Sequence, residues 1–145
     1  MNKNQKKNRE IYLASLFTYW CGIYKLPLPL LIRDNRMKYI GAVKKLKYTF
    51  NFLYSMNQIE RLQDFDIMTF IFHELGHIKY PNKDRIKAEI NAERFALREL
   101  KKRFPKYYEK QVKYTKRCLK QKSYFWKEKY PEHYEAFKRI KEYNE

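Results

Sequence analysis

The centre of the chain contains the stretch Phe72-His73-Glu74-Leu75-Gly76-His77. Its two histidines are four residues apart, so on a helix they lie on one face, and both imidazoles can reach a single zinc ion. Glu74 lies about 100° further round the helix, where it can contact a water on the metal but cannot join the pair as a ligand. The stretch therefore predicts a metal-activated hydrolytic site, with His73 and His77 as ligands and Glu74 as general base.

The residues around this stretch are apolar. The run from Asp66 to Phe72 precedes the first histidine, and Leu75 and Ile78 follow it. We expect a helix that begins near Asp64 or Asp66, ends at about Lys79 and is buried on most of its circumference. Burying two histidines and a glutamate is costly unless a partner satisfies them, and a metal ion would do so. The alternative is a pair of core histidines hydrogen-bonded to carbonyl groups.

A catalytic zinc site usually has three protein ligands and one open position. The long metzincin pattern would need glycine and histidine where this chain has Tyr80 and Lys83, so that pattern is excluded. The next helix, expected from about residue 83 to 103, carries Glu89 and Glu93 four residues apart. The sequence therefore offers these two acids as a zinc ligand and as a side chain that orients a ligand.

Small residues flank the two acids, because Ala92 and Ala96 lie beside them on the helix. They would let the glutamate helix approach the histidine helix closely. The alternative is an ordinary amphipathic helix, in which the acids lie at the solvent boundary and pair with neighbouring basic side chains. Those basic residues are Arg85, Lys87 and Arg94.

The rest of the chain predicts an α+β fold. A first helix is expected over residues 10–24, after a frayed basic segment 1–9. Three short extended segments, 28–33, 39–43 and 47–54, predict a small sheet; in the third, Tyr48, Phe50 and Phe52 alternate with polar residues. Two further helices are expected at 106–122 and 131–143. We assign residues 1–104 to a zincin-like metallopeptidase domain and residues 105–145 to a basic, aromatic-rich helical extension.

Charge and cysteine content bear on the partners and the compartment. The 145 residues carry a net charge of +17, and residues 101–145 alone hold 15 basic and 6 acidic side chains. Such a surface attracts polyanions, and lysines interleaved with tyrosines and with Tyr124-Phe125-Trp126 make nucleic acid a possible partner. The alternative is that the aromatic residues of the extension pack on the catalytic unit. His133 is interpreted as a surface residue. Two distant cysteines suit a reducing cytoplasm.

Residues 11–24 form an apolar run after four basic side chains, as in a signal peptide. The run is too short to span a bilayer, it contains several polar residues, and Lys25, Pro27 and Pro29 prevent its continuation. We therefore expect a cytoplasmic protein without membrane attachment, and export or membrane attachment remains the alternative.

The order of helix, three strands, histidine helix and glutamate helix resembles the minimal gluzincin zinc metallopeptidases. The archaeal minigluzincins are similar in size, and the ImmA/IrrE type has a similar glutamate helix. Here that helix reads Glu89-Ile90-Asn91-Ala92-Glu93-Arg94-Phe95-Ala96, which matches at Glu89, Ala92, Phe95 and Ala96 and is looser at Asn91 and Glu93. The resemblance covers residues 10–104.

By this resemblance Glu89 is the third zinc ligand and Glu93 orients a ligating histidine. The resemblance also implies a Zn²⁺-dependent endopeptidase that acts on peptides or unfolded proteins through a zinc-bound water, with Glu74 as general base. Self-association, or the C-terminal extension, would hide such a site. Two other functions compete, both without catalysis: a zinc-stapled basic binding protein that contacts nucleic acid or a regulatory protein partner, and a nucleic-acid-binding module that has kept a relic site.

Overall fold

The computed structural model describes residues 1–121 and 124–145, and it describes no side chain of residues 122–126, so Tyr124-Phe125-Trp126 lie outside the described side chains. The fold is α+β, as expected, with one small sheet and several helices. The contacts divide the chain into two compact units, Met1–Ile67 and Met68–Glu145. This division falls at a different point from the expected boundary at residue 104. Among the described helices, none has the length and apolar character needed to cross a bilayer.

Helix α1 (Lys3–Ile23) opens the first unit and begins earlier than expected. The side chain of Asn2 accepts a hydrogen bond from the backbone N–H of Gln5, and the Gln5 side chain accepts one from the backbone N–H of Asn2, both at 2.8 Å. This reciprocal cap satisfies backbone donors that would otherwise lack partners. The prediction that residues 1–9 fray is therefore wrong from residue 3 onward.

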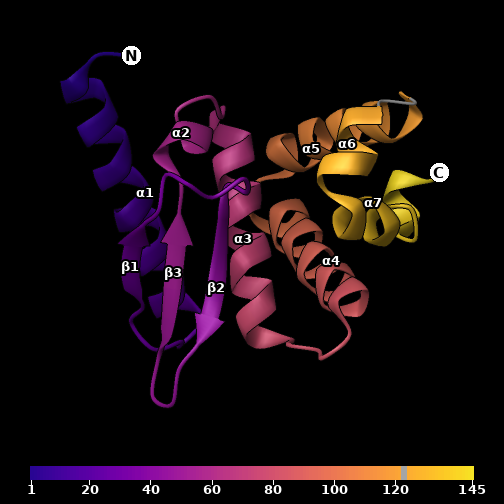
Figure 1. Cartoon of the computed structure of the whole chain (residues 1–145). Coiled ribbons are helices and arrows are strands. Elements are labelled where there is room, and N and C mark those ends of the chain that lie inside the picture. The colour runs from indigo at the N-terminus through magenta and orange to yellow at the C-terminus, as the bar shows by residue number, and fades with distance from the viewer. Residues whose placement is uncertain (122–123) are drawn as a thin grey trace. The chain divides into compact units, whose positions relative to one another are not determined.

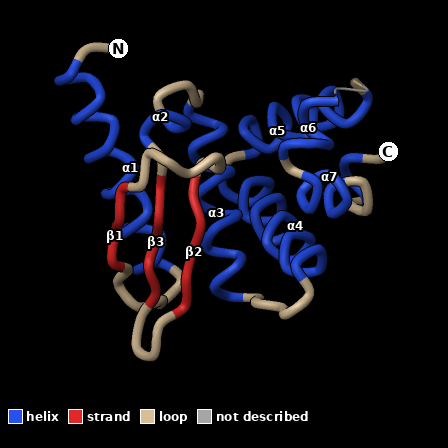
Figure 2. The backbone as a smooth tube through the Cα atoms, viewed as in Figure 1, coloured by secondary structure: helices blue, strands red, loops and turns tan. Residues whose placement is uncertain are grey.

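The sheet of the first unit has three strands in the order β1-β3-β2, as Figure 2 shows. Strand β1 (Leu30–Arg33) runs parallel to β3 (Phe50–Tyr54), and β2 (Gly41–Lys45) runs antiparallel to it. Phe50, Phe52 and Tyr54 are buried, whereas Tyr48 lies before the strand and is 82% exposed. The ring of Phe17 from α1 stacks on Phe52 with centroids 3.9 Å apart, which anchors the helix to the sheet. A single helical turn, α2 (Met56–Ile59), follows β3.

Helix α3 (Asp64–Lys79) begins at the end of the first unit and continues into the second, where α4 (Arg85–Arg103) follows it after a short turn (Figure 1). The Asp84 side chain caps α4 by accepting a hydrogen bond from the backbone N–H of Lys87 at 3.0 Å. The two helices touch at the backbone level, because a Cβ atom on Gly76 would lie only 2.7 Å from the Cα atom of Ala92. The small residues thus allow the expected close approach.

The extension is made of α5 (Pro105–Lys120), α6 (Tyr124–Lys129), α7 (Pro131–Phe137) and a 3₁₀ turn, η1 (Lys141–Tyr143). The last helix ends at Phe137, so the prediction of a continuous helix over 131–143 is wrong. Both α5 and α7 pack on α4. A core forms there from Leu97, Ala136, Phe137, Ile140 and Tyr143. Packing of the extension, one of the two expectations for its aromatic residues, is confirmed for Phe137 and Tyr143, while Tyr114 is 48% exposed.

Candidate metal centre

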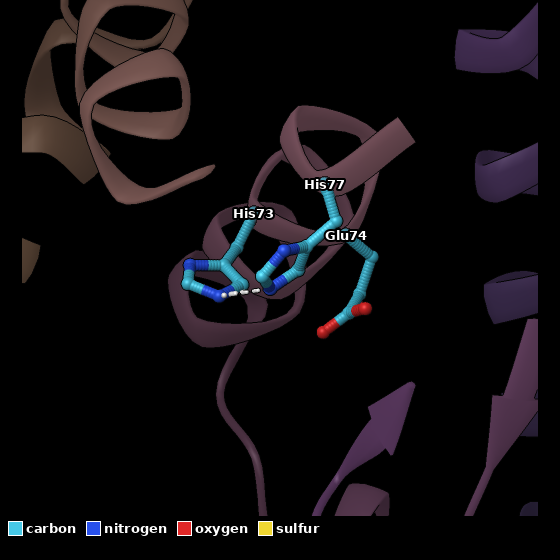
Figure 3. A group of neighbouring side chains, drawn as sticks. All are labelled: His73, Glu74 and His77. Atoms are coloured by element: carbon cyan, nitrogen blue, oxygen red, sulfur yellow. Dashed lines mark hydrogen bonds between the residues drawn. The ribbon is translucent and has the colours of Figure 1, made fainter. Parts of the chain in front are cut away.

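His73 and His77 come from successive turns of α3, and their imidazoles converge. Their Nε2 atoms are 3.1 Å apart, and Figure 3 shows both rings directed toward the same point. The spacing of four residues produces this arrangement, because it places both Cβ atoms on one helix face. His73 is buried, and His77 is partly exposed. The two imidazoles therefore share one helix face, as their spacing predicted, and their role as zinc ligands stays a prediction.

Glu89 of α4 faces the two histidines. Its Oε2 atom lies 2.8 Å from Nε2 of His73, and its Oε1 atom lies 3.2 Å from Nε2 of His77. Burial disfavours the charged carboxylate, but the hydrogen bonds and charges of the two histidines outweigh it and hold the pKa of Glu89 well below its usual range. The alternative in which Glu89 pairs with Arg85 is not observed, because Arg85 contacts Glu132 at 3.3 Å.

Glu93 lies one helical turn further along α4 and holds the other side of the His73 ring. Its Oε2 atom is 2.6 Å from Nδ1 of His73, and its side chain is almost fully buried. An imidazole that donates from Nδ1 leaves the Nε2 lone pair free for a metal. Burial lowers the pKa of His73, but the contacts with Glu89 and Glu93 raise it well above the ordinary value. Glu93 is thus placed to orient His73, and it is not a ligand in this geometry.

Glu74 lies on the neighbouring face of α3, as Figure 3 shows. The residue is only 6% exposed, and its Oε2 atom has no hydrogen-bond partner among the described residues. Burial raises the pKa of Glu74 to about 7, although the charges of His77 and His73 oppose the shift. A carboxyl group with a pKa near neutrality can both accept and donate a proton, as a general base that later acts as an acid requires.

Two residues at this site were not predicted from the sequence. His133 of α7, interpreted as a surface residue, has its Nε2 atom 3.1 Å from Oε2 of Glu89, and its ring lies 5.8 Å from the His73 ring. Tyr143 donates a 2.6 Å hydrogen bond from its hydroxyl group to Oε1 of Glu93. One signal for His133 was present: it shares a helix face with Phe137, four residues later, which is buried.

The donor set fits a zinc ion. Four ligands at about 2.0–2.1 Å in a tetrahedron lie about 3.3–3.4 Å from one another. The contacts among His73, His77 and Glu89 range from 2.8 to 3.2 Å, close to that spacing. The ligand atoms of His73, Glu74 and His77 fall within 4.8 Å of one another, as do those of His73, Glu89 and His133. Imidazole nitrogen and carboxylate oxygen are both ordinary zinc ligands.

Comparison with protein-family models, with curated proteins and with solved structures gives no match for this chain. Function must therefore be inferred from the site itself.

Proposed function

We propose that this chain is a zinc-dependent endopeptidase of gluzincin type, acting on peptides or unfolded proteins. The observation that supports it is the convergence of His73, His77 and Glu89 from two successive helices, with the buried carboxyl group of Glu74 beside them. A site that only stabilised the fold would have no use for a buried, unsatisfied Glu74. Two free cysteines, Cys21 and Cys118, support a cytoplasmic location as part of this proposal.

Each residue has a distinct role in the proposed reaction. When bound, a zinc ion supplies a Lewis acid that lowers the pKa of a coordinated water to about 7 and polarises a peptide carbonyl. Glu74 accepts a proton from the attacking water and passes it to the departing amine. His73, His77 and Glu89 hold the ion, and Glu93 fixes the ring of His73 so that Nε2 faces it.

The test of this proposal is Glu74→Gln, which keeps the shape of the side chain and removes the base. We expect zinc content to stay at one equivalent and cleavage of an unfolded protein such as casein to fall by about 10²–10⁴-fold. Glu109→Gln makes the same chemical change at an exposed position on α5 and should leave cleavage unchanged. If Glu74→Gln cleaves as fast as a parent chain that itself has measurable activity, the assigned base is wrong.

A second candidate is the zinc-stapled basic binding protein. One observation favours it: an open hollow of about 460 Å³ on α5 is lined by Lys113, Lys116, Arg117, Lys120 and Gln121, a cationic surface that suits a polyanion. This candidate predicts tight zinc without cleavage and binding to nucleic acid that weakens steeply with salt. Cleavage that depends on Glu74 would reject it.

A further inference from the structure

His133 comes from α7, a helix far along the chain from α3, yet it lies within the same cluster of donor atoms. Its Nε2 atom contacts Oε2 of Glu89 at 3.1 Å, and that same oxygen lies 2.8 Å from Nε2 of His73. The ligand atoms of these three residues are all within 4.8 Å of one another. The rings of His133 and His73 are also nearly parallel, with an interplanar angle of 24°.

The packing of α7 holds His133 in this position. Ala136 and Phe137, three and four residues later, are buried in the core that α7 shares with α4. Arg85 at the start of α4 contacts Glu132 at 3.3 Å, and the ring of Phe137 lies 6.2 Å from that of His73. The imidazole of His133 is thus directed to the site by its helix and does not reach it by chance rotation of a surface side chain.

We propose that His133 is a fourth protein ligand of the same metal ion, so that the site is closed to substrate while α7 keeps this position. Four of the six distances among these ligands, at 2.8–3.2 Å, are near the spacing of about 3.3–3.4 Å expected for tetrahedral zinc. Zinc with four protein ligands has no open position, whereas a catalytic site keeps one.

The consequence is that hydrolysis requires His133 to leave. His133 is the ligand best placed to do so, because its side chain is 29% exposed, against 18% for His77, 13% for Glu89 and 8% for His73. The ion pair between Arg85 and Glu132 is solvent-exposed and adds little to the hold of α7. This inference rests on the metal site of the proposed function but does not depend on peptide hydrolysis.

The test compares the full-length parent chain with His133→Ala and with His133→Gln, which preserves the volume of the side chain. Glu135→Gln on the same helix is the control. Zinc affinity is measured by competition with a chromophoric chelator. Cobalt(II) then replaces zinc, because zinc has no d–d spectrum. Azide is titrated into each cobalt-loaded chain, and the visible bands of the cobalt ion are followed. Azide changes the spectrum only where it can displace a water from the metal. Circular dichroism verifies that each chain is folded.

Loss of a residue that only orients a ligand costs 10–100-fold in metal affinity, so we expect both His133 variants to raise the zinc Kd by at least about tenfold. Azide should alter the cobalt spectrum of both variants and leave those of the parent and of Glu135→Gln unchanged. A zinc Kd that does not change, or an equal azide response in parent and variants, would overturn the inference. In that case the 3.1 Å contact between His133 and Glu89 does not reflect metal coordination.

The outcomes separate the two claims. If none of the four chains binds one equivalent of metal, the inference and the proposed function both fail. If the metal and azide results are as expected and His133→Ala cleaves casein faster than the parent, both are supported. If the metal and azide results are as expected but His133→Ala cleaves nothing, the fourth ligand stands and the peptidase proposal fails.

Discussion

Replacing Gly76 with alanine should separate the two helices that carry the candidate metal site. A Cβ atom at this position would lie 2.7 Å from Cα and 2.8 Å from the carbonyl oxygen of Ala92. Carbon atoms in contact are normally about 3.5–4.0 Å apart, so α3 and α4 must separate by roughly 0.8 Å. The obstruction is backbone, which cannot rotate away as a flexible side chain would.

The free energy of unfolding should fall even though alanine is the better helix former. Overpacking of this kind costs about 1–3 kcal/mol, and the gain in helix propensity offsets about 0.8–1.0 kcal/mol of it. We expect a net loss of up to about 2 kcal/mol, which corresponds to a decrease of up to roughly 8 °C in Tm. Glu89 lies one turn before Ala92 on α4, so the same shift moves its carboxylate away from His73 and His77, and the zinc Kd should rise by about tenfold.

The assay is thermal unfolding followed by circular dichroism without metal, together with zinc competition. Gly22→Ala is the matched control, because Gly22 lies in the last turn of α1 and a Cβ atom there meets nothing within 4 Å. This control should retain or slightly raise Tm. If Gly76→Ala unfolds at the parent temperature or above and binds zinc as tightly, α3 and α4 do not pack as closely as the structure indicates.

Three further predictions concern single side chains. Tyr143→Phe removes the donor to Glu93, so the zinc Kd should rise about tenfold in the chelator competition; an unchanged Kd would show that this hydrogen bond does not support the metal site. Burial raises the pKa of Cys21 to about 12, so at roughly pH 8 a thiol reagent should label Cys118 rapidly in the native chain and both cysteines only after unfolding; rapid double labelling would contradict it. The hydrogen bond from the start of α4 lowers the pKa of Asp84, so the cap stabilises the fold above the unfolded pKa of about 3.9 and loses this effect as the pH falls through the folded value. Asp84→Ala should therefore lower Tm at neutral pH, with a difference that shrinks toward about pH 3; a pH-independent difference would mean that charge plays no part.

Much of the site could be predicted because its geometry is local. The spacing of His73 and His77 fixes both rings on one helix face, whatever the rest of the chain does. The same argument relates Glu89 to Glu93, and the structure places one on the histidine Nε2 atoms and the other on Nδ1 of His73. The α+β class followed from periodicity in the same way, since the alternation of Phe50 and Phe52 marked a strand.

The predicted helix boundaries were wrong where the local sequence signal was weak or absent. The start of α1 at Lys3 depends on the reciprocal contacts between Asn2 and Gln5, in a segment whose composition suggests fraying. The helix over 131–143 was extended too far because Ile140 and Tyr143 fit its period, although α7 ends at Phe137 and a 3₁₀ turn carries Tyr143. Boundaries of this kind depend on competing local hydrogen bonds of similar energy.

The sequence by itself determined that two histidines and an acid share a helix, and that a second helix with small residues and two acids comes after it. The tertiary structure alone decided that His133 contacts Glu89 and that Tyr143, 50 positions after Glu93, donates to it. The physical reason is that residue spacing sets geometry within one helix only. A contact between elements depends on which apolar faces are buried against each other, and here the burial of Phe137 and Ile140 beside α4 brings both side chains to the candidate metal centre.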